Sequence, residues 1–391
     1  MCMVQGAVEG TVAPGFEGVR DAFARQFESG QHIGAAVAVY HRGRPVVDLW
    51  GGVADDDAGT PWREDTMCVC YSTTKGLTAT CLHVLADRGL ISYDDLVSKH
   101  WPEFAQHGKE SVTVRHVLTH QAGIPQQPDG YLNEALLDWD KMIHGMEQLE
   151  PLWEPGTANG YHAYNFGWLV GELVRRVSGR SVGTFLREEI AAPLGIDGMY
   201  IGAPASAEPR IAKVTSRIVL TPEMEAARAT ISSGSLLGRA MPAWMGDSVA
   251  FVNTPAAHQA EIPAVTGTMT ARDLARMYAA IAQGGELDGT RIMTAERVRL
   301  MVEPQPKRPD KVISIEIPWG LGYMLGGGVI TTEGPRATAL GHPGFGGSIG
   351  FADPEIEMAF GFVPNALTMD LLGGSRSTEL ADAARAAIAA L

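Results

Sequence analysis

The sequence predicts an α+β fold in which one antiparallel sheet is flanked by helices and joined to a mainly helical lobe. A helical segment and two β-rich runs stand near the N-terminus, and short β-rich runs with Gly-rich turns stand near the C-terminus. The residues between them form helical pieces joined by Pro- and Gly-rich loops. We therefore expect the two ends to share one sheet and the middle to form a second lobe, with a cleft where they meet.

The predicted N-terminal elements are a helix that ends at Gly30, a β-hairpin with a short turn at Arg42-Gly43-Arg44, and a second helix that ends at Gly89. Glycine is common just after a helix, because it adopts the left-handed conformation without steric cost. The helices cover residues 16–29 and 75–88, and the strands cover residues 34–41 and 45–50.

The remaining predicted elements follow in two groups. Helices are predicted over residues 112–120, 133–146, 166–177 and 183–190, and Thr270-Ala271-Arg272-Asp273 looks like a capping box that opens a helix to Ala282. Short strands are predicted over residues 321–324, 328–332, 348–352 and 358–363, before a closing helix over 377–391. Residues 1–90 and 265–391 would then form the α/β lobe, and residues 91–264 the mainly helical lobe.

The composition is that of a globular protein with net negative charge. Of 391 residues, 45% are hydrophobic and 19% are charged, which excludes a disordered chain. Lys and Arg number 31 against 45 Asp and Glu, so the net charge is 31 − 45 = −14. This charge disfavours nucleic acid and anionic membrane surfaces as partners.

The cysteines and the N-terminal residues bear on the compartment. The four cysteines form no C-x-x-C pair, so they favour neither a zinc site nor a disulfide framework and suggest a reducing compartment. Residues 1–11 lack the charge and apolar core of a signal peptide, and no apolar run is long enough to span a bilayer. These features predict a cytoplasmic protein, and they leave its oligomeric state open.

Ser72-Thr73-Thr74-Lys75 is the first motif that could carry chemistry. Residues i and i+3 share one helix face, so the Lys75 amine can reach the Ser72 hydroxyl. A serine nucleophile needs a nearby base, and a lysine can serve when burial or a neighbouring charge lowers its pKa. The helix N-terminus would add N–H groups suited to an oxyanion. The alternative is an N-cap serine with a solvated lysine, but the apolar run over residues 67–71 favours a buried position.

Gly160-Tyr161-His162-Ala163-Tyr164-Asn165 is the second motif, and it stands between a Trp-Glu-Pro-Gly loop and a predicted helix. A tyrosine beside a lysine can exist partly as phenolate and act as a base. The alternative is that the two tyrosines pack beneath the start of the helix.

His342-Pro343-Gly344 is the third motif, within a Gly-rich stretch between two predicted strands. Glycines at this point would let a substrate approach the edge of a strand closely. The alternative is a tight hairpin turn.

Two further patterns are interpreted as structural. Gly346-Gly347-Ser348-Ile349-Gly350 matches the G-x-S-x-G nucleophile elbow, but in that fold the catalytic histidine follows the serine, whereas the last histidine here is His342. His116 and His120 have the i, i+4 spacing of metal-binding helices, but the glutamate of a zincin is missing after the first histidine. We interpret the first pattern as a Gly-rich turn and the second as structural helix contacts.

The order of the motifs, S-x-x-K, then a tyrosine motif, then H-x-G near the C-terminus, resembles the serine β-lactamase and penicillin-binding-protein superfamily. The branch is similar to class C β-lactamases and their esterase relatives, the family VIII carboxylesterases. Residues 115–123 and 319–323 also look like segments of that group. The resemblance covers residues 16–391 and implies a β-lactamase/DD-peptidase-like fold.

The resemblance implies roles for particular residues. Ser72 would be the acyl-accepting nucleophile and Lys75 its proton partner. Tyr161 would match the tyrosine of the Y-x-N motif, acting with Lys75 as base and then as acid to the leaving group. His342-Pro343-Gly344 would replace the K-T-G motif in substrate binding, and the backbone N–H groups of Ser72 and Phe345 would form the oxyanion hole. No metal or organic cofactor is implied.

Two departures from the family pattern bear on these roles. Ala163 stands where Y-x-N has Asn, and the spacing to the next helix is one residue long, so Tyr164 competes with Tyr161. His342 stands where K-T-G has lysine, and a largely neutral histidine supplies less positive charge for a substrate carboxylate at pH 7. Both departures are of the kind seen in esterase members.

These features together predict a serine carboxylesterase that hydrolyses short-chain carboxylic esters through an acyl-enzyme on Ser72, with weak β-lactamase side activity. A β-lactamase, a D-amino-acid peptidase and an acyltransferase are alternatives with the same nucleophile. A non-catalytic binding protein on this scaffold is a further alternative, but the presence of Ser72, Lys75 and Tyr161 together argues against it. The expected partner is a small-molecule ester.

Overall fold

The main sheet of the protein draws its strands from both ends of the chain. The computed structural model describes residues 8–219, 221–222, 234–242, 248–328, 332–369 and 374–391. The strands of this sheet are β1 (Glu9–Val12), β2 (Gly34–His41), β3 (Arg44–Asp55), β4 (Thr60–Pro61), β11 (Met324–Leu325), β12 (Leu340–Pro343), β13 (Ile349–Asp353) and β14 (Met358–Pro364).

The strand order is β1-β3-β2-β14-β13-β12-β11, with β4 paired to β3. β2 pairs antiparallel with β14, so the N-terminal hairpin and the C-terminal strands complete one antiparallel sheet, as predicted. The other short strands are β5 (Cys68–Val69), β6 (Met199–Tyr200), β7 (Thr215–Ser216), β8 (Thr268–Met269), β9 (Glu286–Leu287), β10 (Thr290–Arg291) and β15 (Ala366–Leu367).

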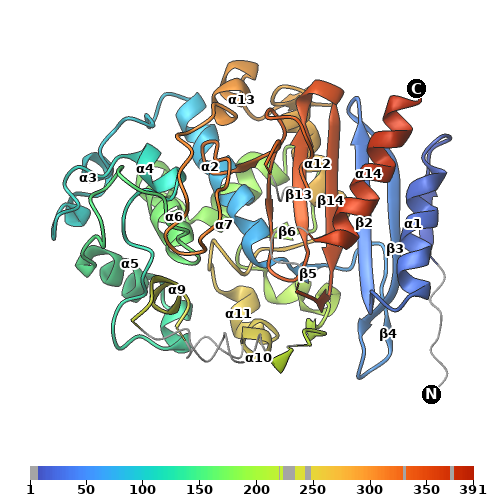
Figure 1. The fold of residues 1–391 in the computed structure, drawn as a ribbon, viewed down its shortest axis with the longest axis horizontal. Helices are drawn as coiled ribbons and strands as arrows, with labels where there is room; N and C mark the ends of the chain where they lie inside the picture. Colours follow the sequence, from blue (N-terminus) through green and yellow to red (C-terminus); the bar gives the residue numbers. More distant parts are fainter. Residues whose placement is uncertain (1–7, 220, 223–233, 243–247, 329–331, 370–373) are drawn as a thin grey trace.

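Helices cover both faces of the sheet and make up most of the middle of the chain (Figure 1). The α-helices are α1 (Glu17–Glu28), α2 (Thr74–Asp87), α3 (Val97–His100), α4 (Val114–Leu118), α5 (Trp139–Gln148), α6 (Asn165–Ser178), α7 (Val182–Leu186), α9 (Leu236–Ala240), α10 (Ser248–Val252), α11 (Pro255–Gln259), α12 (Ala271–Ala282), α13 (Ala295–Met301) and α14 (Ser375–Ala389). The tighter or wider turns are η1 (Tyr71–Thr73), η2 (Pro102–Phe104), η3 (Asn133–Leu137), η4 (Arg187–Ala191), η5 (Ala205–Arg210) and η7 (Pro354–Ile356).

The central strand β2 separates two hydrophobic cores. Because side chains alternate along a strand, Val37 and Val39 face the core beneath α1 and α14, whereas Ala38 and Tyr40 belong to the larger core on the α12 side. Every residue of β2 is buried, as is typical of a strand covered on both faces. The sheet is therefore an interior layer between the α1–α14 pair and the rest of the molecule (Figure 1).

Glycines in the C-terminal strands let α12 approach the sheet closely. A Cβ at Gly361 in β14 would lie 2.4 Å from the Ala271 carbonyl oxygen, and one at Gly350 in β13 would lie 2.5 Å from the Tyr278 ring. Side chains at these positions would push the helix away, so the Gly-rich strands are a packing requirement.

Several predicted elements differ in the structure. The helix predicted over 133–146 is split into η3 and α5, and that predicted over 183–190 is split into α7 and the π-helical turn η4. β1 and β12 were not predicted as strands, and the strand predicted over 328–332 lies largely outside the described residues. The Thr270 hydroxyl caps α12 by accepting from the Asp273 N–H, but the Asp273 carboxylate accepts from Gly198 instead of completing a capping box.

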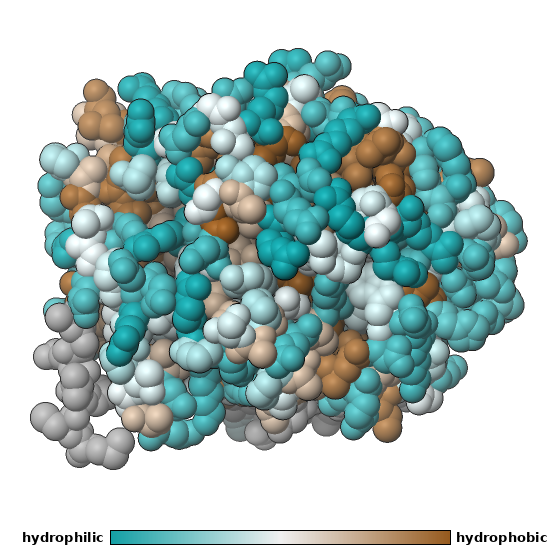
Figure 2. All heavy atoms as spheres, turned by 180° about the vertical axis from the view of Figure 1, so that it is seen from behind, coloured by the Kyte–Doolittle hydropathy of each residue, from teal (hydrophilic) through white to brown (hydrophobic). Residues whose placement is uncertain are grey.

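The surface seen from behind is mostly hydrophilic, with small separate apolar areas (Figure 2). Within the described residues, no helix is both long enough and apolar enough to cross a membrane. The division of the chain at residues 90 and 264 into two lobes stays a prediction.

Candidate active site

Ser72 lies in the turn η1, which leads directly into α2. Residues Thr74–Ala86 of this helix are all buried, so α2 is enclosed on every side by its neighbours. Tyr71, just before Ser72, has φ 45°, a left-handed conformation that is uncommon for a bulky residue. Such strained backbone is often found at functional sites, and here it turns the chain from β5 into the helix.

The side-chain amine of Lys75 is enclosed by two backbone carbonyl groups and the Ser72 hydroxyl. Its Nζ atom lies 3.0 Å from Ser72 Oγ, 2.7 Å from the Ala163 carbonyl oxygen and 3.3 Å from the Ala264 carbonyl oxygen. Lys75 is fully buried, whereas Ser72 is partly exposed. Solvent or a substrate can therefore reach the hydroxyl but not the amine.

Burial of Lys75 without an acidic partner favours its neutral form. Desolvation lowers the pKa of Lys75 well below its usual value. A neutral amine has two hydrogens and one lone pair, so it can donate to the two carbonyl groups of Ala163 and Ala264 and accept the Ser72 proton. This arrangement suits a general base for a serine nucleophile.

Tyr161 lies against Lys75 and Ser72. The Lys75 Nζ atom is 5.0 Å from the centre of the Tyr161 ring. Burial raises the pKa of Tyr161, an effect that a hydrogen bond with Ser72 opposes and the Asp310 carboxylate reinforces. This direction favours the neutral phenol over the partial phenolate considered from the sequence, and it leaves Lys75 as the group that can accept a proton.

Tyr164 occupies a different position. It is the residue just before α6, it packs against the main core, and no hydrogen bond joins it to Ser72 or Lys75 within the described residues. Ala163, at the position of the family's asparagine, meets Lys75 through its backbone carbonyl. The contacts with the nucleophile and base therefore belong to Tyr161.

His342 lies on β12, a strand that was not predicted from the Gly-rich sequence. It is 1% exposed, and its Nδ1–H donates to the Pro343 carbonyl at 2.7 Å, so its Nε2 atom carries a lone pair. Burial, then the nearby Lys75, lower the pKa of His342 to about 3, partly offset by the bond to Pro343. The ring is neutral and supplies no cation to the site.

The turn after β12 lies against the turn that carries Ser72. A Cβ at Gly344 would lie 2.2 Å from the Cys70 carbonyl oxygen and 2.3 Å from Ser348 Oγ. Phe345, which follows, contacts Tyr71 edge to face at 5.6 Å between ring centres. In the described part of the chain its N–H donates to no protein group, which leaves it available to an oxyanion.

Ser348 links the same two segments and is not an exposed nucleophile. It is 3% exposed, its hydroxyl donates to the Cys70 carbonyl at 2.8 Å, and it lies 3.0 Å from Thr73 Oγ1. It directly precedes strand β13 and not a helix. The interpretation of the G-x-S-x-G match as a Gly-rich turn is therefore consistent with these contacts.

An aromatic cluster beside Tyr161 was missed from the sequence. The His120 ring lies 4.9 Å from the Tyr161 ring and 4.5 Å from Trp319, and Tyr161 and Trp319 are nearly parallel at 6.3 Å. The predicted shared helix face of His116 and His120 is wrong, because α4 ends at Leu118 and His120 lies beyond it with φ 57°, although His116 does make a structural contact in the cap of α4. No local pattern in the sequence signalled this cluster, because the helix predicted over residues 112–120 included His120.

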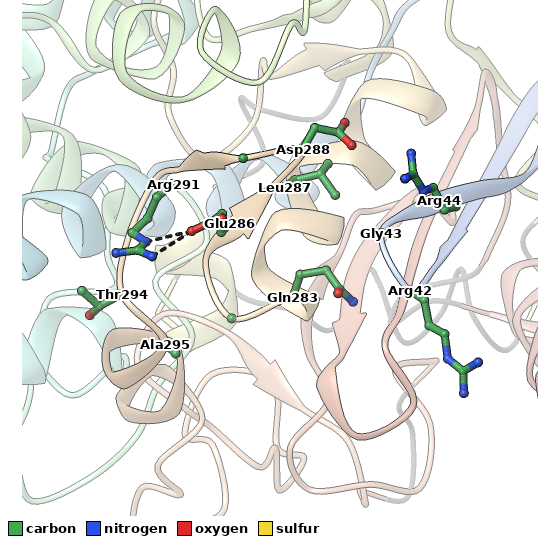
Figure 3. Close-up of a pocket in the computed structure, with 12 residues that line it drawn as sticks. Arg42, Gly43, Arg44, Gln283, Glu286, Leu287, Asp288, Arg291, Thr294 and Ala295 are labelled. Atoms are coloured by element: carbon green, nitrogen blue, oxygen red, sulfur yellow. Dashed lines mark hydrogen bonds and ion pairs between the residues drawn. The ribbon is translucent and has the colours of Figure 1, made fainter.

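The groove in Figure 3 lies at the other end of α2. Thr294, one of its lining residues, bonds Asp87, the last residue of α2, whereas Ser72 precedes the first. A helix of 14 residues is about 21 Å long, so the groove is distant from Ser72.

Comparison with known proteins agrees with this geometry. A family model described as "Beta-lactamase" matches residues 19–385. The chain is 40% identical to the "Esterase/beta-lactamase LipL" of Mycobacterium tuberculosis over 376 residues, which are 93% of this chain and 84% of that protein.

Two solved structures are similar over nearly the whole chain. A family VIII carboxylesterase is 40% identical with a TM-score of 0.89, over 97% of this chain and 100% of that one. A penicillin-binding protein homologue from Caulobacter crescentus is 36% identical with a TM-score of 0.86, over 97% and 100% of the two chains. Family match, fold and motif order agree: the chain belongs to the β-lactamase family.

Proposed function

We propose that this protein is a serine carboxylesterase that hydrolyses short-chain, uncharged carboxylic esters. The observation that carries the proposal is the buried amine of Lys75, 3.0 Å from the partly exposed Ser72 hydroxyl, beside a neutral His342. Relatives named as an esterase/β-lactamase and a family VIII carboxylesterase support the same conclusion.

The reaction would proceed in two steps. The Ser72 oxygen attacks the ester carbonyl carbon while Lys75 takes the serine proton, and the oxyanion is bound by the N–H groups of Ser72 and Phe345. The C–O bond to the alcohol then breaks, and Tyr161 donates a proton to the leaving alkoxide. Lys75 returns the proton to Tyr161, which restores the pair. Water attacks the acyl-enzyme in the same way and releases the acid and free Ser72.

The charge of the site favours esters over substrates with a carboxylate. A lysine at the position of His342 would offer a cation, whereas the ring of His342 is neutral and its Nε2 atom carries a lone pair. Lys75 itself is held toward its neutral form. Neither His342 nor Lys75 therefore supplies a positive charge to balance a substrate carboxylate.

A β-lactamase or D-amino-acid peptidase remains the second candidate. It uses the same nucleophile, and the penicillin-binding protein homologue at 36% identity supports it. An acyltransferase would differ only in the acceptor, an alcohol in place of water. A cytoplasmic location also belongs to the proposal, and the free, buried state of Cys68, Cys70 and Cys81 is compatible with it.

The test is hydrolysis of p-nitrophenyl acetate and butyrate beside nitrocefin, a cephalosporin with a carboxylate. Wild type should cleave the esters far faster than nitrocefin, and Ser72→Ala should remove both activities. Ser348→Ala is the matched control and should keep measurable activity, because its hydroxyl binds the backbone. Faster turnover of nitrocefin would favour the second candidate, and full activity in Ser72→Ala would refute the nucleophile.

A further inference from the structure

His120 holds an unusual backbone conformation beside the tyrosine segment. Its φ is 57°, in the left-handed region, which histidine and asparagine tolerate better than most residues. It stands two residues after the end of α4, and its side chain is 1% exposed. The turn brings both the backbone carbonyl and the ring of one residue against the chain at Tyr161.

Two hydrogen bonds that His120 accepts flank Tyr161. The Gly160 N–H donates to the His120 carbonyl at 3.0 Å, and the His162 N–H donates to His120 Nδ1 at 3.0 Å. The intervening N–H, that of Tyr161, faces the carboxyl group of Asp310. Three consecutive backbone N–H groups are thus directed toward fixed acceptors.

The His120 ring also supports the tyrosine ring. It lies 4.9 Å from the centre of the Tyr161 ring on one side and 5.0 Å from Phe166 of α6 on another. Trp319, stacked on Tyr161, contacts the same histidine at 4.5 Å. The Tyr161 ring therefore packs against a histidine whose backbone carbonyl binds Gly160 and against a buried tryptophan, and these two rings also contact each other.

The His120 ring keeps one protonation state. Because Nδ1 accepts a hydrogen bond, the ring proton is on Nε2. Burial, and then the nearby His162, Lys75 and His342, lower the pKa of His120 well below its usual value. The acceptor at Nδ1 is therefore present across the neutral and alkaline range.

We propose that His120 is a positioning residue that holds the Tyr161 phenol against Ser72 and Lys75. The inference rests on the proposed function, because the orientation of Tyr161 matters only if this tyrosine transfers a proton. His120 itself touches no reacting atom in this scheme.

The test compares His120→Ala, His120→Asn and His120→Gln by ester hydrolysis and thermal unfolding. In His120→Ala, kcat should fall about 30-fold with KM within about threefold, because small misplacement of a catalytic group reduces the rate strongly. His120→Asn should recover to within about fivefold of wild type, since Asn tolerates this φ and its Oδ1 can take the place of Nδ1. His120→Gln, whose oxygen lies one bond further out, should not recover.

His116→Ala is the matched control. His116 lies on the same segment, and its N–H and ring complete the cap of α4 with Thr113. This variant should lower the melting temperature while kcat stays near wild type. Suppose instead that His116→Ala melts at the same temperature as His120→Asn and still has a low kcat. Any disturbance of the segment would then be enough to lower kcat, and the inference would be overturned.

Tyr161→Phe separates the two proposals. If Tyr161→Phe is inactive and His120→Ala keeps wild-type kcat, the positioning role is refuted and the proposed function stands. If Tyr161→Phe keeps its activity, the proton-transfer role of this tyrosine is refuted together with the positioning role. If His120→Ala fails to fold, equal kcat values in the Asn and Gln variants would refute the role of Nδ1.

Discussion

The two ends of helix α2 carry two unlike regions. Before its first residue, the turn that carries Ser72 meets Lys75 and the β12–β13 turn, and Lys75 and His342 are buried there and held toward their neutral forms. Beyond its last residue lies the groove of Figure 3, between the β2–β3 turn and the β9–β10 hairpin, with exposed Arg44 and the ion pair Arg291–Glu286.

The difference shows which features indicate chemistry. The Arg291–Glu286 pair joins side chains that are 66% and 42% exposed, so water screens both charges and leaves them unreactive. At Ser72, burial lowers the pKa of Lys75 and raises that of Tyr161. Opposite shifts in neighbouring groups are typical of an acid–base pair, whereas a hollow lined by solvated charges is not.

The largest effect is expected from removal of the base. Lys75→Met should lower kcat/KM for p-nitrophenyl butyrate by about 10³-fold, because general-base catalysis contributes 10² to 10⁴. The free energy of unfolding should change by only about 1 kcal/mol. The variant leaves two carbonyl groups unpaired, which destabilises the fold, but it also removes a buried polar amine, which stabilises it. Urea unfolding supplies the control, and activity within tenfold of wild type would exclude Lys75 as the base.

The pH profile sharpens the assignment of the base. Protonated Lys75 cannot accept the Ser72 proton, so kcat/KM should rise with pH through the lowered pKa of Lys75 and level off above it. The pKa of His342 is about 3 because of burial and Lys75, so this ring is already neutral there. His342→Gln should leave the midpoint of the rise in place; loss of the rise would identify His342 as the titrating group.

The next largest effect is expected where the β12–β13 turn contacts the segment that carries Ser72. In Gly344→Ala, the new methyl would lie 2.2 Å from the Cys70 carbonyl oxygen, so the β12–β13 turn must move away from Ser72. We expect kcat/KM to fall about 10²-fold and the unfolding free energy to fall by about 1–3 kcal/mol.

Gly18→Ala is the control for that substitution. Gly18 lies in α1, and an added Cβ has nothing within 4 Å. Its activity should equal that of wild type, and alanine in a helix should stabilise it slightly. Wild-type kcat/KM in Gly344→Ala would mean that the approach of the two turns does not matter for the reaction.

The smallest effect is expected at the groove. Arg291→Gln removes one side of an exposed ion pair, which contributes about 0–1 kcal/mol at most. The ester kcat/KM should stay within twofold of wild type, as measured in the same assay. A loss comparable to that of Gly344→Ala would connect the groove to the Ser72 site and break the contrast between the two ends of α2.

The sequence alone determined what depends on near neighbours. Helical periodicity before Gly30 and Gly89 predicted α1 and α2, and the Arg42-Gly43-Arg44 turn predicted the β2–β3 hairpin. The spacing of Ser72 and Lys75 predicted their contact, because residues three positions apart lie on the same face of a helix. The motif order was sufficient to identify the family.

Only the tertiary structure decided what depends on distant segments. The carbonyl partners of Lys75 lie 88 and 189 residues away in sequence, so neither its burial nor its neutral state follows from local pattern. β12 is a strand because β13 pairs with it, and its buried Gly, His and Pro show no alternation to detect. The contact of His120 with Tyr161 likewise depends on the tertiary fold, because the two residues are 161 − 120 = 41 positions apart in the sequence.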